Sequence, residues 1–275
     1  MNICQEFVAA HNLKFGTNAD PSMSKTKCII FTKKNISTEK YKPIELDGNE
    51  LPWVTNVKHL GHILQKDNSM KLDIAKKRGT FIGKTNSLLQ EFSNVPHEAF
   101  LKIFQSYVTN LYGSNLWDLF GKECEKLYTS YNVAIRNILK VDRCTHRYLI
   151  EAMSEIPHLK SMLCSRFVTF HQSLRKSPKF PVRFLSKLVE SDLRTVHGKN
   201  LAGIASRCDL NEQSPHLLRS KLVKEKMIYR QVPEAEHWRV GLSRELLDIR
   251  DKDDWYLPNF TYEEVNTLLR CVCIA

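Results

Sequence analysis

The spacing of apolar residues changes once along this chain, after Asp67, and that change constrains the fold. Before Asp67 the apolar residues form short runs rich in Val, Ile, Leu and Phe, which is typical of buried strands. After Asp67 they recur about every 3.6 residues, as on one face of a helix. The pattern predicts an α+β protein: a small antiparallel sheet fragment followed by a mainly helical remainder.

The strand-forming part is expected to begin with a short helix over Asn2–Leu13 and a turn-rich loop. Asp47-Gly48 is typical of the tight type I′ turn of a hairpin. Neither face of the last apolar run is wholly polar, so we expect it to be covered on both sides. The predicted strands are Cys28–Phe31, Ile44–Leu46 and Val54–Leu64.

The helical part should pack as a bundle, because none of its helices can bury an apolar stripe alone. One long helix is expected from Met70 to Phe92, and a second, opened by Pro96, with a stripe that reaches Leu119. A third should cover Leu127–Leu139. Later predictions are a helix from Pro157, a loop at Thr195–Gln213, and helices at 215–230, 234–250 and 261–272, the last opened by a Thr261–Glu264 capping box.

The charge of the chain favours a polyanionic partner. It has 41 Lys and Arg against 30 Asp and Glu, a net charge of +11 and a pI near 9.2. The alternative is a basic globular protein without such a partner.

Eight scattered cysteines without a secretory signal indicate reduced thiols and an intracellular location, and no apolar run is long enough to span a membrane.

Four short motifs follow one another in an unusual order. They are Lys25-Thr26-Lys27 before Cys28–Phe31, then His59-Leu60-Gly61, then Leu111-Tyr112-Gly113 with Trp117, then Ile135–Leu139. This order resembles that of the reverse transcriptases of LINE-type (non-LTR, jockey-like) retrotransposons. The resemblance runs from about Cys4 to about Leu149, a little over half of the chain.

The resemblance implies three parts. Residues 1–67 would be the end of the palm with a hairpin like the primer grip, residues 68–150 a thumb-like helical bundle, and residues 151–275 a helical C-terminal region. The family's catalytic Tyr-x-Asp-Asp turn would lie upstream of Met1. We therefore expect no catalytic residue and no cofactor in this chain, although the parent polymerase would need Mg²⁺, and we expect the chain alone to be inactive.

A basic stretch between Gln65 and Gln90 is the main candidate for nucleic-acid binding. It contains six basic and two acidic residues, and helical spacing allows Lys77 and Lys84 to share a face. Lysine and arginine bind a phosphate backbone without reading its sequence. In the family the first thumb helix follows the template–primer duplex. The candidate residues are Lys76, Lys77, Arg78 and Lys84, and the alternative is a solvated helix face.

Two further groups take their roles from the resemblance. A lysine near the strand that here carries Lys25 and Lys27 assists pyrophosphate departure in the family, a role that is void without the catalytic aspartates. The alternative is a pair of solubilising lysines beside a strand. The hairpin matching His59, Leu60 and Gly61 holds the primer end in the family. Here its expected role is structural.

Metal binding is not predicted. The close pairs Cys144-x-His146 and Cys271-x-Cys273 do not supply four ligands at a workable spacing. The acidic cluster Asp251–Asp254 is more typical of a solvated turn than of a metal site.

Two functions follow from these observations. The first is a fragment of a retrotransposon-derived RNA-directed DNA polymerase that retains binding to RNA or an RNA–DNA duplex. The second is a non-enzymatic helical interaction protein domesticated from a retroelement. Both predict a cytoplasmic or nuclear protein without membrane contact. Salt should weaken phosphate binding steeply and an apolar protein interface much less.

Overall fold

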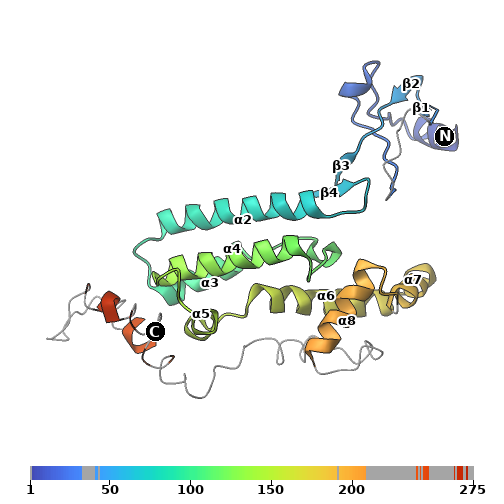
Figure 1. The fold of residues 1–275 in the computed structure, drawn as a ribbon. Coiled ribbons are helices and arrows are strands. Elements are labelled where there is room, and N and C mark those ends of the chain that lie inside the picture. The colour runs from blue at the N-terminus through green and yellow to red at the C-terminus, as the bar shows by residue number, and fades with distance from the viewer. Residues whose placement is uncertain are drawn as a thin grey trace. The chain divides into compact units, whose positions relative to one another are not determined.

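The structure is a computed structural model, and its fold is α+β, as predicted (Figure 1). It describes residues 2–32, 41–42, 44–190 and 192–208, with residues 240, 242, 244–247, 263, 265–268 and 271 in the C-terminal region. The chain divides into two compact units, Met1–Asp73 and Ile74–Ala275.

All four strands lie before residue 66, and the elements described after them are helices. Up to Gln65 the elements are α1 (Asn2–Ala10), η1 (Pro21–Met23), β1 (Ile44–Leu46), β2 (Asn49–Leu51), β3 (Asn56–His59) and β4 (His62–Gln65). The helices that follow are α2 (Lys71–Glu91), α3 (His97–Tyr107), η3 (Ser114–Leu116), α4 (Lys122–Leu139), α5 (Arg147–Ser154), α6 (Leu159–Arg175), α7 (Phe180–Glu190) and α8 (Val196–Arg207).

The hairpin predicted at Asp47-Gly48 is confirmed. β1 and β2 pair antiparallel with Ile44 opposite Leu51. Asp47 and Gly48 have φ angles of 54° and 71°, the positive values that a type I′ turn requires at both central residues. This turn therefore fixes the register of the first sheet.

The prediction of one strand over Val54–Leu64 is wrong. The run is a hairpin, because Leu60 and Gly61 take positive φ angles of 46° and 83° and reverse the chain between β3 and β4. The expected cover on both sides is also wrong, since Leu60 is 75% exposed and most of β3 is exposed. A two-residue turn thus lies inside a run that reads as continuous strand.

The predicted strand Cys28–Phe31 is reduced to a single parallel bridge. The Cys28 N–H donates to the carbonyl oxygen of Pro52 at 2.9 Å, and the Val54 N–H donates to the carbonyl oxygen of Cys28 at 2.8 Å. Pro52 has no N–H of its own, so it cannot donate to a longer ladder.

A buried carboxylate fastens the second hairpin to the first turn of α2. Asp73 is fully buried, and one of its oxygens lies 3.1 Å from Nδ1 of His62, which is also buried. The other oxygen accepts a hydrogen bond from the Ile63 N–H at 3.1 Å. Burial of a carboxylate is tolerable only with such partners.

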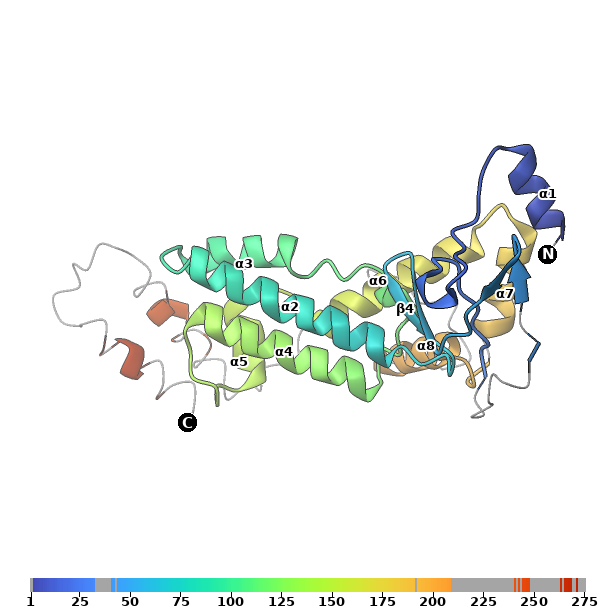
Figure 2. The ribbon, with the colours of Figure 1, turned by 90° about the horizontal axis from the view of Figure 1, so that it is seen from above.

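Three helices form the first layer of the second unit, and α2 runs alongside α3 and α4 (Figures 1 and 2). The predicted long helix is confirmed in α2, whose Phe81 ring meets the rings of Phe104 from α3 and Tyr131 from α4. Helix α3 follows Pro96 as predicted but ends at Tyr107. Its predicted stripe to Leu119 is wrong beyond that point, because the chain turns at Gly113, with φ at 78°, into η3.

The loop predicted at Thr195–Gln213 is wrong for residues 196–207, which form α8, while residues 209–213 lie outside the described residues. The Thr195 hydroxyl caps this helix by accepting from the Gly198 N–H at 3.0 Å. A methyl group on Gly198 would collide with the carbonyl of Asp192, and one on Gly203 would lie 2.6 Å from the Phe120 ring. These glycines permit close packing and do not mark a loop.

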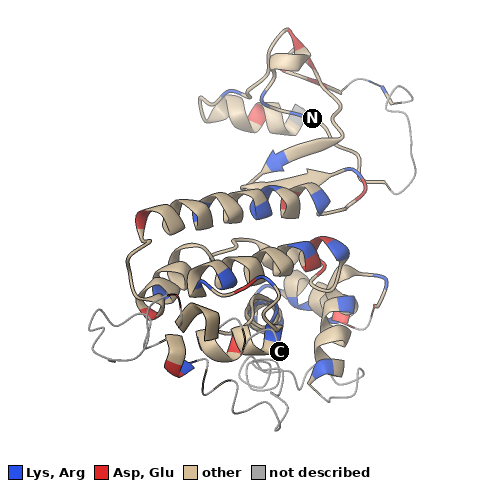
Figure 3. Ribbon diagram, turned by 60° about the vertical axis from the view of Figure 1, so that its left-hand side comes forward, with Lys and Arg blue, Asp and Glu red and all other residues tan. Residues whose placement is uncertain are grey.

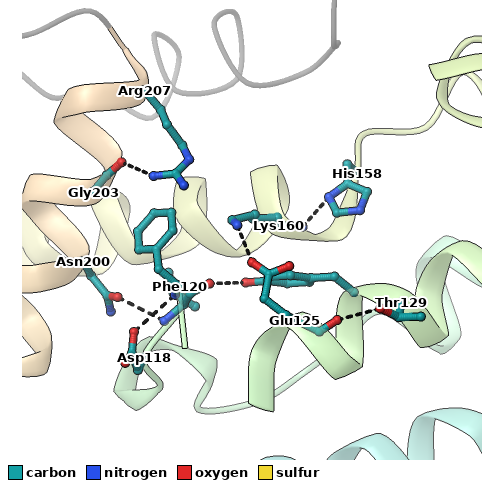
Figure 4. Close-up of polar contacts among 11 residues, drawn as sticks. Asp118, Phe120, Glu125, Thr129, His158, Lys160, Asn200, Gly203 and Arg207 are labelled. Carbon is teal, nitrogen blue, oxygen red and sulfur yellow. Dashed lines mark hydrogen bonds and ion pairs between the residues drawn. The ribbon is translucent and has the colours of Figure 1, made fainter. Parts of the chain in front are cut away.

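Polar contacts connect α8 and α6 to the chain around Phe120 (Figure 4). Asn200 donates to the carbonyl oxygen of Trp117 at 2.8 Å and accepts from the Leu119 N–H at 3.0 Å. Lys160 pairs with Glu125 at 2.6 Å and also lies over the Phe120 ring. The buried thiols of Cys124 and Cys164 belong to the same layer of helices, α4 and α6.

The rest of the second unit was predicted unevenly. The helix expected after Pro157 is confirmed in α6, whereas α5 and α7 were not predicted. Residues 244–247 and 265–268 are helical, within the helices predicted at 234–250 and 261–272. The predicted helix 215–230 and the Thr261–Glu264 capping box lie outside the described residues. Among the described helices, none has the length and apolar character needed to cross a membrane.

Candidate nucleic-acid interface

The apolar stripe of α2 decides where its basic residues point. Ile74, Phe81 and Leu88 are buried and lie seven residues apart, so they form one line along the helix. With that line held against α3 and α4, the residues between them are directed to its flanks or to solvent. Figure 3 shows the basic residues of α2 concentrated in its N-terminal part.

Lys77 and Lys84 lie on the same flank of α2, as predicted by their spacing, and each meets a tyrosine. The ammonium nitrogen of Lys77 is 5.8 Å from the centroid of the Tyr112 ring. That of Lys84 is 4.5 Å from the centroid of the Tyr107 ring. Both distances are within the range of a cation–π interaction. We call these four residues the lysine–tyrosine face.

The tyrosines of this face are the exposed partners. Tyr107 is 53% exposed and Tyr112 is 64% exposed, whereas both lysines are half-buried. A cation over an exposed aromatic ring keeps its charge near the surface, and the ring leaves a flat side for stacking. The face therefore combines positive charge with exposed aromatic rings.

The end of α3 places both tyrosines. Tyr107 is the last residue of α3, and the chain then turns through Val108–Gly113. The Thr109 hydroxyl donates to the carbonyl oxygen of Gln105 at 2.5 Å. Arg166 from α6 donates to the carbonyl oxygen of Thr109 at 2.9 Å. These bonds hold the segment between the two rings.

The other two candidate residues point elsewhere. The Arg78 Nε donates to the Ser130 hydroxyl of α4 at 2.8 Å, so its guanidinium lies on the opposite flank of α2. Lys76 is exposed on the outer side of the helix. The structure thus brings two of the four basic residues together and separates the other two.

A shallow groove of about 260 Å³ lies between α2 and α4, beside Arg78. Phe81 and Ala134 form part of its lining, and Ile82 and Val133 leave 38% and 49% of their surfaces exposed along it. The groove offers apolar surface next to one cation. It is therefore better suited to a side chain than to a phosphate.

The residues His59, Leu60 and Gly61, and the lysines Lys25 and Lys27, lie in the first unit. His59 ends β3, and Leu60 with Gly61 forms the exposed turn described above. Lys25 and Lys27 are exposed and lie outside any strand, with the Lys25 N–H donating to the carbonyl oxygen of Gly16 at 2.8 Å. Among the described residues, neither group makes a hydrogen bond to a charged side chain.

Sequence reasoning did not identify the role of the tyrosines. In the sequence Tyr112 belongs to the Leu-Tyr-Gly motif, and Tyr107 falls inside the longer helix that the apolar stripe predicts. A usable signal was present, because an aromatic residue on the polar side of an amphipathic helix is a candidate for surface contact.

Metal ligands do not gather in the part of the chain that the structure describes: it holds no group of three or more His, Cys, Asp or Glu side chains suited to an ion. Cys144 is exposed, and the ring of nearby His146 stacks on Tyr148. Cys273 and the acidic cluster Asp251–Asp254 lie outside the described residues.

Comparison with protein-family models, with curated proteins and with solved structures finds no match to this chain.

Proposed function

We propose that this protein binds RNA or an RNA–DNA duplex through the lysine–tyrosine face. The observation that supports the proposal is the pairing of Lys77 with Tyr112 and of Lys84 with Tyr107 on one flank of α2. Charge beside exposed aromatic rings is the usual composition of sequence-tolerant nucleic-acid surfaces. The net charge of +11 acts in the same direction.

The spacing of the lysines suits a regular array of phosphates. Seven residues of α-helix rise by about 10 Å. One strand of B-form DNA advances by about 3.4 Å per phosphate along its axis, and an A-form RNA duplex by somewhat less, so the lysines span roughly three to four steps. The α2 helix carries five basic and two acidic residues, which adds positive charge around the pair. Backbone binding of this kind reads charge and shape and not base sequence.

The order of motifs supports a more specific version of the proposal. In it the protein derives from a non-LTR reverse transcriptase, with α2–α4 as a thumb-like bundle beside the duplex. RNA-directed DNA synthesis belongs to the parent enzyme, and we assign no catalytic residue and no cofactor to this chain. A cytoplasmic or nuclear location is part of this proposal.

A salt titration of duplex binding tests the proposal. The full chain is titrated with a blunt RNA–DNA duplex at several salt concentrations. We expect Lys77→Ala/Lys84→Ala to weaken binding about tenfold or more and to reduce the slope of log K against log salt by about two. The matched control is Lys176→Ala/Lys179→Ala, which removes two exposed lysines between α6 and α7 and should leave both quantities near wild type. Equal losses in the two variants would contradict a localised face.

The α2–α4 groove supports a second candidate function, a helical interaction protein. The exposed Ile82 and Val133 would receive an apolar side chain of a protein partner. Such binding should be insensitive to salt and should be lost in Val133→Asp but not in Lys77→Ala/Lys84→Ala. Duplex binding that weakens with salt and in Lys77→Ala/Lys84→Ala, but is kept in Val133→Asp, would favour the first function.

A further inference from the structure

A second, larger cavity lies next to the segment that carries the two tyrosines. It has a volume of about 600 Å³, within the usual range for small-molecule sites. Helix α6 supplies one wall, and the chain from α3 to η3 supplies the other. The lining residues that matter here are Gln105, Asn115, Ser161, Ser165, Arg166 and Phe170.

Asn115 lines this cavity, and its side chain carries an unsatisfied acceptor. Its side-chain oxygen is buried and has no hydrogen-bond partner among the described residues. A buried acceptor without a donor is unfavourable, and such groups are uncommon in folded proteins. A rotation of the Asn115 amide that turns this oxygen toward the cavity would let an N–H donor on a ligand satisfy it.

The α6 wall supplies polar groups and an aromatic ring. Ser161 and Ser165 are buried and lie one turn apart, so they face the cavity together. Arg166 uses one N–H to hold the Thr109 carbonyl oxygen, and a guanidinium carries five N–H donors in all. The half-buried ring of Phe170 lies in the same lining.

We propose that this cavity binds the base of an unpaired nucleotide in the same nucleic acid. The inference rests on the proposed function. Phe170 supplies a surface for base stacking, Asn115 accepts from an exocyclic amino group such as that of adenine, and Arg166 binds a flanking phosphate.

The two sites share one segment of chain. Tyr107 and Tyr112 meet the lysines of α2, while Gln105 and Asn115 line the cavity, and Thr109 between them is held by Arg166. A single strand that leaves a duplex at the lysine–tyrosine face therefore has to pass only this segment. Duplex and unpaired nucleotides would be bound by neighbouring parts of one unit.

The test compares three RNA ligands on the full chain: a blunt duplex, the same duplex with a short adenosine overhang, and the same overhang without bases. We expect the adenosine overhang to bind about tenfold more tightly than the abasic one, since stacking is the difference between them. Phe170→Leu should reduce this ratio to about one, because it removes the stacking ring, whereas Asn115→Leu should reduce it only in part and without lowering the melting temperature, because it removes the acceptor alone. Asn110→Leu, an exposed position in the same segment, should preserve the ratio.

The outcomes separate the two proposals. Lys77→Ala/Lys84→Ala should weaken all three ligands and leave the ratio unchanged. Equal binding of the adenosine and abasic overhangs by the wild-type protein would overturn the cavity proposal, while binding of the blunt duplex would still support the proposed function. Absence of binding to any RNA would overturn both.

Discussion

The side chain of Asn200 donates a hydrogen bond to the carbonyl oxygen of Trp117, 2.8 Å away and 83 positions earlier in the chain. The same amide accepts from the N–H of Leu119. Asn200 and both partners are fully buried. One amide thereby joins α8 to the turn before α4 and completes the packing of the second unit.

Asn200→Leu should destabilise the second unit by about 2–3 kcal/mol, because the buried Leu119 N–H loses its acceptor and the shape of the side chain is nearly kept. The midpoint of urea unfolding measures this. Lys199→Leu introduces the same residue at the adjacent exposed position and should change stability little. Similar midpoints for the two variants would contradict the role given to Asn200.

The glycines of α8 and α2 should respond in opposite directions to a methyl group. Gly198→Ala should destabilise by roughly 1–3 kcal/mol, because its Cβ would overlap the backbone carbonyl of Asp192. Gly79→Ala, in an exposed helix interior with nothing within 4 Å, should stabilise by about 0.5–1 kcal/mol. Melting temperatures of the pair check both signs, and a stabilising Gly198→Ala would be incompatible with the close approach.

The stability of the protein should fall in mild acid partly through His158. Nδ1 of His158 accepts from the Lys160 N–H at 3.1 Å, so protonation there breaks a helix cap. Burial, with smaller effects of Arg147 and Lys160, lowers the pKa of His158 from 6.5 to about 3. Between these values the unfolded chain binds a proton that the folded chain does not. Stability is therefore lost as pH falls through this window, by at most about 1.4 kcal/mol per pH unit.

His158→Asn should remove this contribution, because asparagine can cap the helix without titrating. The free energy of unfolding, measured from pH 6.5 to 4, should change less steeply with pH than in the wild type. The difference in slope should correspond to the uptake of about one proton on unfolding. Thr195→Asn changes the cap of α8 without removing a titratable group and should leave the pH dependence as it is. An unaltered slope in His158→Asn would show that the proton binds elsewhere.

The tyrosine rings, and not their hydroxyls, should matter for nucleic-acid binding. Tyr107→Leu and Tyr112→Leu should each weaken binding of a single-stranded RNA by roughly five- to tenfold, the effect of removing one aromatic stacking surface. Tyr107→Phe and Tyr112→Phe keep the ring and should bind within about twofold of wild type. Fluorescence anisotropy compares all four, and equal losses for the Leu and Phe variants would exclude stacking.

Local patterns predicted the parts of the fold that local chemistry decides. The Asp47-Gly48 turn and the apolar line through Ile74, Phe81 and Leu88 were both readable, because turn type and helical period are properties of neighbouring residues. Gly198 and Gly203 misled because they touch Asp192 and Phe120, contacts that exist only after folding.

In the candidate site, too, the features set by neighbouring residues were predictable and the contacts between distant residues were not. Helical spacing placed Lys77 and Lys84 on one flank of α2. Their tyrosine partners depend on where α3 ends and on the turn before Gly113, which Arg166 stabilises from a distant helix. Arg78 could not be separated from Lys77 without knowing that Ser130 lies on the opposite flank.

The buried thiols of α4 and α6 can be used to measure how often these packed helices separate. Burial raises the pKa of Cys124 and of Cys164 to about 12, so neither is a thiolate near neutral pH while the helices stay packed. Cys144 is exposed and accessible to a thiol reagent in the folded state. Slow modification of Cys164 would therefore record how often the helices separate, without any added probe.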